Sequence, residues 1–167
     1  MTRAANFLPE LQEKDAPAEI RTIYEEIRRL TGVPMVALIW RHLATLPGAL
    51  PDAWSSLAPI LRSGVLQETA WQIAGDARLQ PLARLQSAAL RRMGVDSAAQ
   101  LAIDAVFDAY NRANPVNMLC VYTLLARLIR PDGQALAPDV VLWSAPPSIE
   151  RLPRMYEPAE MSPQLRR

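Results

Sequence analysis

The sequence is poor in the side chains that hold metals and disulfides, since its 167 residues include one cysteine and one histidine. A single cysteine excludes a disulfide within the chain and any Cys-x-x-Cys redox or zinc pair. A single histidine excludes a metal site built from several histidines of one chain. We therefore expect no metal ion and no other cofactor.

The chain also lacks an excess of one charge and a long apolar run. Its 18 basic and 17 acidic residues give a net charge of +1, whereas a surface for nucleic acid needs a basic excess on one face. No apolar run reaches the roughly 18 residues of a membrane span, and the N-terminal stretch MTRAANFLPELQEKD lacks the apolar segment of a signal peptide. We expect a cytoplasmic protein that binds neither nucleic acid nor a membrane.

What the chain does have is apolar residues at helical spacing, because half of its residues are hydrophobic. The pattern predicts helices over residues 15–32, 34–48, 50–64, 65–80, 81–94 and 97–129. The first of these carries one apolar stripe made of Ile20, Ile23, Tyr24, Ile27 and Leu30. No stretch before residue 130 alternates convincingly as a strand does. We expect an all-α fold, a compact bundle of about six to seven helices.

Four residues mark the expected helix ends. Asp15 suits an N-cap, and Gly32 suits a C-terminal stop. Pro34 suits the first position of the second helix. Asp96 is placed to cap the last helix.

The last 37 residues, 131–167, differ from the rest in composition. They hold seven of the chain's 15 prolines: Pro131, Pro138, Pro146, Pro147, Pro153, Pro158 and Pro163. Proline-rich segments form tails and linkers rather than cores, although DVVLW (139–143) could be extended. We divide the chain into a helical domain, 1–130, and a proline-rich tail, 131–167, which we expect to pack on a partner subunit.

The stretch YNRANPVNML (110–119) is unusual because it places polar groups in the most apolar part of the chain. Asn111, Asn114 and Asn117 follow one another at spacings of three, and buried amides without partners cost roughly 1–3 kcal/mol each. Pro115 either kinks the long helix or marks a new one with Asn114 as its N-cap. A helix N-terminus among apolar residues can bind a small anion, so Asn114 is a candidate pocket residue.

Two segments resemble a known enzyme family. They are YEEIRRLTGVPMVALIWRHLATLPGALPDAW (24–54) and YNRANPVNMLCVYTL (110–124). With their V-P, A-T-x-P-G and N-P pairs, they are similar to the all-helical group I 2-haloacid dehalogenases, also labelled halocarboxylic acid dehydrogenases. Known members carry two such halves in one chain, joined by a proline-rich linker, with the active site between them. This chain resembles one half, over roughly residues 6 to 130, followed by a proline-rich tail.

The resemblance implies hydrolysis of 2-haloalkanoic acids by direct attack of water, without a covalent intermediate. The family's asparagine, which positions the water, falls on Asn114. Its second-half tyrosine falls on Tyr110 when the two halves are overlaid. The first-half aromatics that line the halide and alkyl end fall on Met35 and Leu38, and the water-activating aspartate of the second half overlays Met35.

Because Met35 is not a carboxylate, other residues become candidates for its role. His42 follows it by seven residues on the same predicted helix, and it is either a base near neutral pH or a hydrogen-bonded structural histidine. Asn111 is a candidate substrate contact on the face that also carries Asp108. The simpler interpretation of Asp108 is a surface ion pair with Arg112.

Three classes of function remain open. The first is a hydrolase of short 2-halocarboxylic or related small acids. The second is a peroxidase or decarboxylase, against which the missing Cys-x-x-Cys pair and the single histidine weigh. The third is a non-catalytic binder of small carboxylic acids, or an interaction protein that keeps the fold.

The apolar helices also predict self-association. Residues 35–40 and 116–125 offer no continuous polar side, and exposed apolar patches beyond a few hundred Å² are unusual on monomers. A two-fold homodimer would bury the same patch twice. We therefore expect a homodimer that binds a small carboxylic acid.

Overall fold

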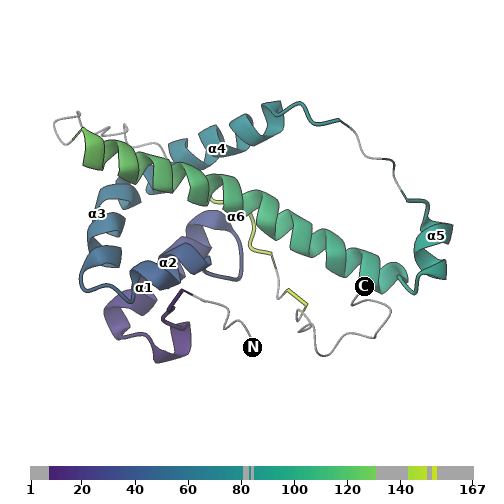
Figure 1. The fold of residues 1–167 in the computed structure, drawn as a ribbon, viewed down its shortest axis with the longest axis horizontal. Helices are drawn as coiled ribbons and strands as arrows, with labels where there is room; N and C mark the ends of the chain where they lie inside the picture. Colours follow the sequence, from purple (N-terminus) through teal and green to yellow (C-terminus); the bar gives the residue numbers. More distant parts are fainter. Residues whose placement is uncertain (1–7, 81–82, 84, 131–142, 150–151, 154–167) are drawn as a thin grey trace, which may run out of the picture.

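The computed structural model describes residues 8–80, 83, 85–130, 143–149 and 152–153. Within them lie six α-helices and one short 3-10 helix, and no strand. The helices are α1 (Ala18–Thr31), α2 (Leu38–Leu43), α3 (Ala49–Arg62), α4 (Val65–Asp76), α5 (Ser87–Arg92) and α6 (Ser97–Ile129), with the 3-10 helix η1 at Glu13–Asp15. The all-α prediction is confirmed for this part of the chain (Figure 1).

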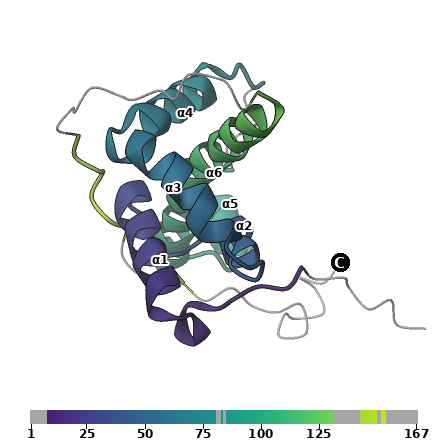
Figure 2. The ribbon, with the colours of Figure 1, turned by 90° about the vertical axis from the view of Figure 1, so that its left-hand side faces the viewer.

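The core lies where α1, α3 and α4 meet the second half of α6, with α3 between α1 and α4 (Figure 2). The predicted stripe of α1 is buried throughout: Ile20, Ile23, Tyr24, Ile27 and Leu30. Trp40 of α2 and Trp54 of α3 meet edge to face, with ring centroids 6.4 Å apart and planes at 85°. Aromatic pairs of this kind add about 0.5–1.5 kcal/mol to the gain from burial. The core therefore fixes the short helix α2 against its neighbours.

The start of α1 differs from the prediction. The helix begins at Ala18 with Pro17 in the N-cap position, and Asp15 lies in η1 instead of capping α1. Gly32 ends the helix as predicted, in the left-handed conformation at φ +67°.

The second helix is shorter than predicted. It begins at Leu38 rather than at Pro34. The Trp40 amide donates to the carbonyl of Ala37, and the carbonyl of Val36 accepts a hydrogen bond from the Arg41 guanidinium instead. The Arg41 side chain thus occupies the Val36 carbonyl, which would accept from the Trp40 amide if the helix began earlier.

The last helix was predicted correctly and runs without interruption from Ser97 to Ile129. Asp96 caps it, since its carboxylate accepts a 2.8 Å hydrogen bond from the Ala99 amide. Pro115 lies inside the helix, so the alternative in which a new helix starts at Asn114 is wrong. Pro115 has no amide hydrogen to donate to the carbonyl four residues earlier, so one helical hydrogen bond is missing there. The helix nevertheless continues on both sides of it.

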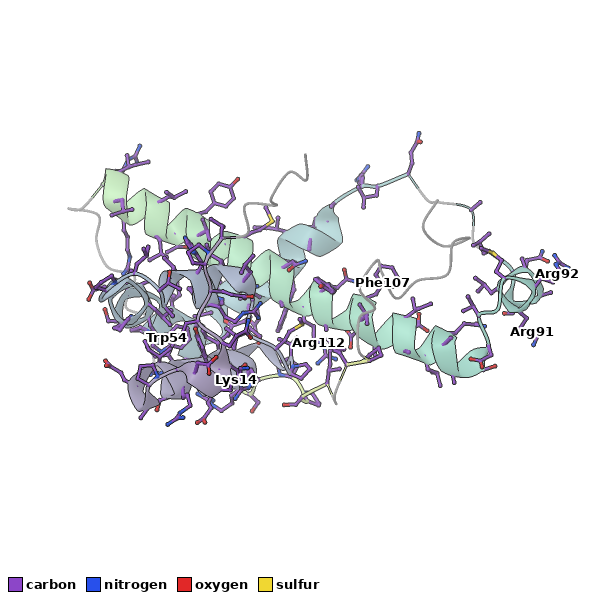
Figure 3. The ribbon with its side chains drawn as sticks, turned by 60° about the horizontal axis from the view of Figure 1, so that its bottom comes forward. Lys14, Trp54, Arg91, Arg92, Phe107 and Arg112 are labelled. Carbon is purple, nitrogen blue, oxygen red and sulfur yellow. The ribbon has the colours of Figure 1, made fainter. Side chains whose placement is uncertain are left out.

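The first part of α6, together with α5, extends away from the core (Figure 1). We call residues 87–108 the arm. Phe107, labelled in Figure 3, is 61% exposed, and Leu101 is 72% exposed. α5 has no buried residue. The arm therefore presents apolar side chains that no described element of the chain covers.

Residues 143–149 cross back over their own chain, and we call them the strap. Trp143 packs on Gly64 so closely that an added Cβ there would lie 2.2 Å from its ring. The amide of Ile149 donates to the carbonyl of Gly32 over 2.9 Å. The strap thus joins the C-terminal end of α1 to the turn between α3 and α4.

The strap also contacts α6, where Arg112 donates a 2.7 Å hydrogen bond to the carbonyl of Pro147. Packing of the tail on a partner subunit stays a prediction. Residues 139–142, most of the predicted extended segment, lie outside the described residues. Within the part of the chain that the structure describes, no helix has both the length and the apolar character needed to span a bilayer.

Candidate functional site

A hollow of about 330 Å³ lies between the end of α1, residues 33–38 and the middle of α6. Apolar side chains from α1 and from residues 33–38 form most of its wall. The larger polar side chains in the wall are Arg41, Tyr110, Asn114 and Asn117. Small-molecule sites in proteins combine apolar walls with a few polar groups in this way. We call this space the α2–α6 hollow.

The structure brings four of the six predicted site residues to this hollow. Met35 and Leu38 line it from one side, and Tyr110 and Asn114 line it from α6. Tyr110, Asn114 and Asn117 share one face of the helix because they are four and three residues apart. Asn114 is exposed in this single chain and makes no helix cap, so its amide is available to the hollow.

His42 lies outside this hollow. Its Nδ1 is 2.8 Å from the carbonyl oxygen of Pro9, and since a carbonyl only accepts, Nδ1 is the donor. The contact fits the structural alternative stated for this histidine.

Asn111 lies on a different face of α6. It lines a second hollow, of about 480 Å³, between α4 and α6, which Tyr110 and Asn114 also border. We call this space the α4–α6 hollow. Its other walls include Ile73 and Met118, both exposed. The face that Tyr110 and Asn114 share is therefore flanked by two hollows.

The carboxylate near Asn111 is engaged in a surface ion pair. Asp108 accepts hydrogen bonds of 3.2 and 2.8 Å from Arg112, the i, i+4 pair expected from the sequence. An exposed pair of this kind contributes only about 0.3–0.5 kcal/mol, and it leaves Asp108 tied to a cation rather than to a reacting group.

Asn117 is a wall residue that the sequence did not predict as part of the site. Its Oδ1 accepts a 2.8 Å hydrogen bond from the indole Nε1 of Trp40. The indole nitrogen is a donor only, so this contact fixes which end of the amide faces Trp40. The amide nitrogen of Asn117 is left to donate elsewhere.

Arg41 is a second wall residue that the sequence did not predict. Its Nε donates to Glu10 over 2.7 Å, and its Nη1 donates to the carbonyl of Val36. Its side chain is 23% exposed. Among the described residues that line this hollow, Arg41 is the one with a charged side chain.

Cys120 lies one turn beyond Asn117 and is fully buried. Burial raises the pKa of its thiol to about 12, so the reactive thiolate is negligible near neutral pH. Among the described residues, no three His, Cys, Asp or Glu side chains gather into a possible metal site. The chemistry available to the hollow is that of amides, a phenol and a guanidinium.

No protein-family model matches the sequence. Among curated proteins, a configuration-inverting 2-haloacid dehalogenase of Alcaligenes xylosoxydans xylosoxydans is 34% identical over 138 residues, which are 81% of this chain and 46% of that protein. The chain therefore spans about half the length of the curated relative that it matches.

Solved structures of D-2-haloacid dehalogenase have a similar fold. A mutant in complex with D-2-CPA matches with a TM-score of 0.67 at 23% identity, over 95% of this chain and 57% of that one. The complex with L-LA matches with a TM-score of 0.65 at 22% identity over the same shares. The resemblance predicted from the sequence is thus confirmed: the chain is related in sequence and similar in fold to the 2-haloacid dehalogenases, over about half of their length.

Proposed function

We propose that this chain hydrolyses short 2-halocarboxylic acids by direct attack of water, as part of a two-copy assembly. The observation that carries the proposal is the α2–α6 hollow, where Tyr110 and Asn114 face apolar walls. Its volume of about 330 Å³ suits an acid of a few carbon atoms. The relatedness to 2-haloacid dehalogenases supplies the reaction class.

In this proposal each wall residue has a distinct task. The side-chain carbonyl of Asn114 accepts from the attacking water and orients it towards C2 of the acid. A C–O bond forms as the C–halogen bond breaks, the halide leaves, and the water gives up a proton to the solvent, because no carboxylate is among the described residues that line the hollow. Attack opposite the leaving halide inverts C2. Met35 and Leu38 contact the alkyl and halogen end.

The expected rate of hydrolysis depends on what Tyr110 and Met35 can do for the attacking water. The phenol of Tyr110 stands beside Asn114 and offers a donor or acceptor for the water or the leaving group. Met35 stands where the family has its aspartate and cannot take the proton. Loss of a general base typically costs 10²–10⁴-fold in rate, so we expect slow hydrolysis.

The two-copy assembly is supported by the exposed apolar side chains of α6. Those that would be covered include Ile103, Phe107, Met118, Tyr122, Leu125 and Leu128. A second copy packed on this face would also close the hollows beside Asn114. The two-copy assembly is tested by measuring the mass in solution by light scattering, where we expect twice the chain mass of 18.5 kDa. A species at the chain mass over the whole micromolar range would contradict the assembly.

The activity is tested by halide release from each enantiomer of 2-chloropropionate. We expect slow turnover that Asn114→Ala abolishes and Met35→Asp raises, with inverted lactate as the product. Gln72→Ala is the matched control, because that amide is exposed on α4 and lines neither hollow, and it should leave the rate unchanged. No halide release by either the native chain or Met35→Asp would overturn the proposed function.

A further inference from the structure

We propose that Arg41 and Asn117 together bind the carboxylate of the acid in the α2–α6 hollow. This proposal rests on the proposed function only for the place where the acid binds. It adds the residues that recognise the charged end of the ligand, which the sequence alone did not indicate.

The charge in the hollow is the first reason. The wall combines apolar side chains with neutral polar groups and a single cation, Arg41. An anion entering a mostly apolar space loses hydration, and it binds only where a cation and donors replace the lost water. Arg41 supplies the cation at the end of the hollow formed by α2.

The geometry of Arg41 is the second reason. A guanidinium carries five N–H donors in a planar fork that suits a carboxylate. Glu10 engages Nε, and the Val36 carbonyl engages one hydrogen on Nη1. Among the described residues no further partner accepts from Nη2. The two contacts hold the fork in place and leave the Nη2 edge to serve a ligand.

The orientation of Asn117 is the third reason. Since its Oδ1 is engaged by Trp40, its Nδ2 hydrogens are the groups it can offer to the hollow. Asn117 therefore contributes a donor rather than an acceptor. A donor from α6 and a cation from α2 thus lie in the wall of one hollow, and both are groups from which a carboxylate oxygen accepts hydrogen bonds.

Glu10 is the competing anion, and it must be included in the test. It lies in the same ion pair as Arg41, with a side chain 32% exposed. Removing its charge leaves Arg41 unneutralised, so Glu10→Gln should maintain or strengthen carboxylate binding. Removing the guanidinium should weaken it. The two substitutions break the same ion pair, and they separate a ligand-binding role from a structural one.

The experiment is a titration of the full chain with propionate. Binding is measured by calorimetry and by the chemical-shift changes of the Asn117 side-chain amide in NMR spectra. We expect Arg41→Gln to weaken binding at least about tenfold, because charge-assisted hydrogen bonds are roughly twice as strong as neutral ones. Arg41→Lys should lose less, since it keeps the charge but not the fork. Arg28→Gln is the matched control: Arg28 also pairs with a glutamate, Glu13, but lies outside the hollow.

Asn117 is tested by Asn117→Asp, which keeps an acceptor for Trp40 and replaces the amide donor by a negative charge. We expect it to weaken propionate binding more than Asn117→Ala does. Propionamide, which has the same size without the charge, should bind the native chain weakly and should not respond to Arg41→Gln. Thermal unfolding of each variant shows that the fold is kept.

The outcomes separate this proposal from the proposed function. Propionate binding that depends on Arg41, in a chain that releases no halide even as Met35→Asp, would support the carboxylate site of Arg41 and Asn117, which we call the anchor. It would overturn the proposed hydrolase. Halide release with a KM that Arg41→Gln leaves unchanged would keep the hydrolase and overturn the anchor. Equal loss of propionate binding in Arg41→Gln and Glu10→Gln would also overturn the anchor, because it would assign the effect to the ion pair.

Discussion

α1 and α6 show how differently an amphipathic helix and a more apolar helix of one chain can be used. α1 has 14 residues, of which six are buried. α6 has 33 residues, of which three are buried: Ala109, Val116 and Cys120. The helix that is more than twice as long contributes half as many buried residues. Apolar composition therefore does not tell where the core lies, because a helix is buried only where another element covers it.

The same difference separates the core from the arm within α6. Val116 and Cys120 belong to the core cluster, whereas Leu101 and Phe107 of the arm are largely exposed. In the core, each apolar side chain meets neighbours from several helices. In the arm, stability depends on the helix itself and on whatever covers it from outside the chain.

The largest expected effect is in the core, at Leu57 of α3, which is fully buried. Leu57→Ala should lower the free energy of unfolding by about 2–5 kcal/mol, through lost burial and the cavity left behind. Urea unfolding followed by circular dichroism measures it. A loss below about 1 kcal/mol would show that the core described here is loosely packed.

The strap gives the next largest effect. Gly64→Ala would place a Cβ 2.2 Å from the ring of Trp143, at a φ of +78°. We expect a loss of about 1–3 kcal/mol from backbone strain and displacement of the strap. Gly75→Ala is the matched control, because its Cβ would meet nothing within 4 Å inside α4. There a gain of about 0.5–1 kcal/mol is expected from helix propensity, and equal losses at both sites would contradict the docking of Trp143.

Glu26 tests a polar contact at the edge of the core. It accepts hydrogen bonds from Arg62 at 2.8 and 2.9 Å and from the Trp54 indole at 3.0 Å. The hydrogen bonds from Arg62, helped by the one from Trp54 and by the charges of Arg62 and Arg29, outweigh burial and lower the pKa of the Glu26 carboxyl. A lowered pKa adds stability that is present above the unfolded value of about 4.3, and it is lost as the pH falls through the folded value.

Glu26→Gln should therefore cost about 1–2 kcal/mol near pH 7. The difference from the native chain should shrink as the pH falls below the unfolded value of about 4.3 and through the lower folded pKa of Glu26, where the native carboxylate takes up its proton. Urea titrations at pH 7 and at pH 3 measure this. A difference that is constant with pH would mean that packing, and not the ionised carboxylate, carries the contact.

The smallest effect is expected in the arm. Leu101→Ala should change the free energy of unfolding by less than about 0.5 kcal/mol when the chain is monomeric, since Leu101 is 72% exposed. The same substitution measured over a range of protein concentrations sharpens the comparison. A cost that grows with concentration would mean that a second copy covers the arm.

The sequence predicted α6 well because two independent signals agreed there. Asp96 offered a cap, and the apolar run continued to Ile129. The predicted start of α2 was wrong because Pro34 suits the first position of a helix, whereas the contact between Arg41 and the Val36 carbonyl favours a later start. The bond from Arg41 to the Val36 carbonyl competes with the helical bond that the sequence pattern assumes.

Of the side chains that line the α2–α6 hollow, the sequence predicted those that a resemblance to known enzymes supplies: Met35, Leu38, Tyr110 and Asn114. Their roles stay a prediction. The sequence missed Arg41, which looks like a surface charge, and Asn117, which looked equivalent to its two neighbours at spacings of three. The partner of Asn117 is Trp40, 77 residues away. No local pattern encodes a contact over that separation, so only the fold distinguishes the three asparagines.

Two prolines lie past the first turn of a described helix, and they have a consequence for folding kinetics. Pro59 lies within α3 and Pro115 within α6, and the described residues contain no cis peptide bond. In the unfolded chain each such bond is cis in about 10–30% of molecules, and its isomerisation takes tens to hundreds of seconds at 25 °C. Molecules that begin with either bond in cis cannot complete the helix that contains it until the bond rotates. Refolding should therefore divide into a fast and a slow population, and a prolyl isomerase should speed up the slow one alone.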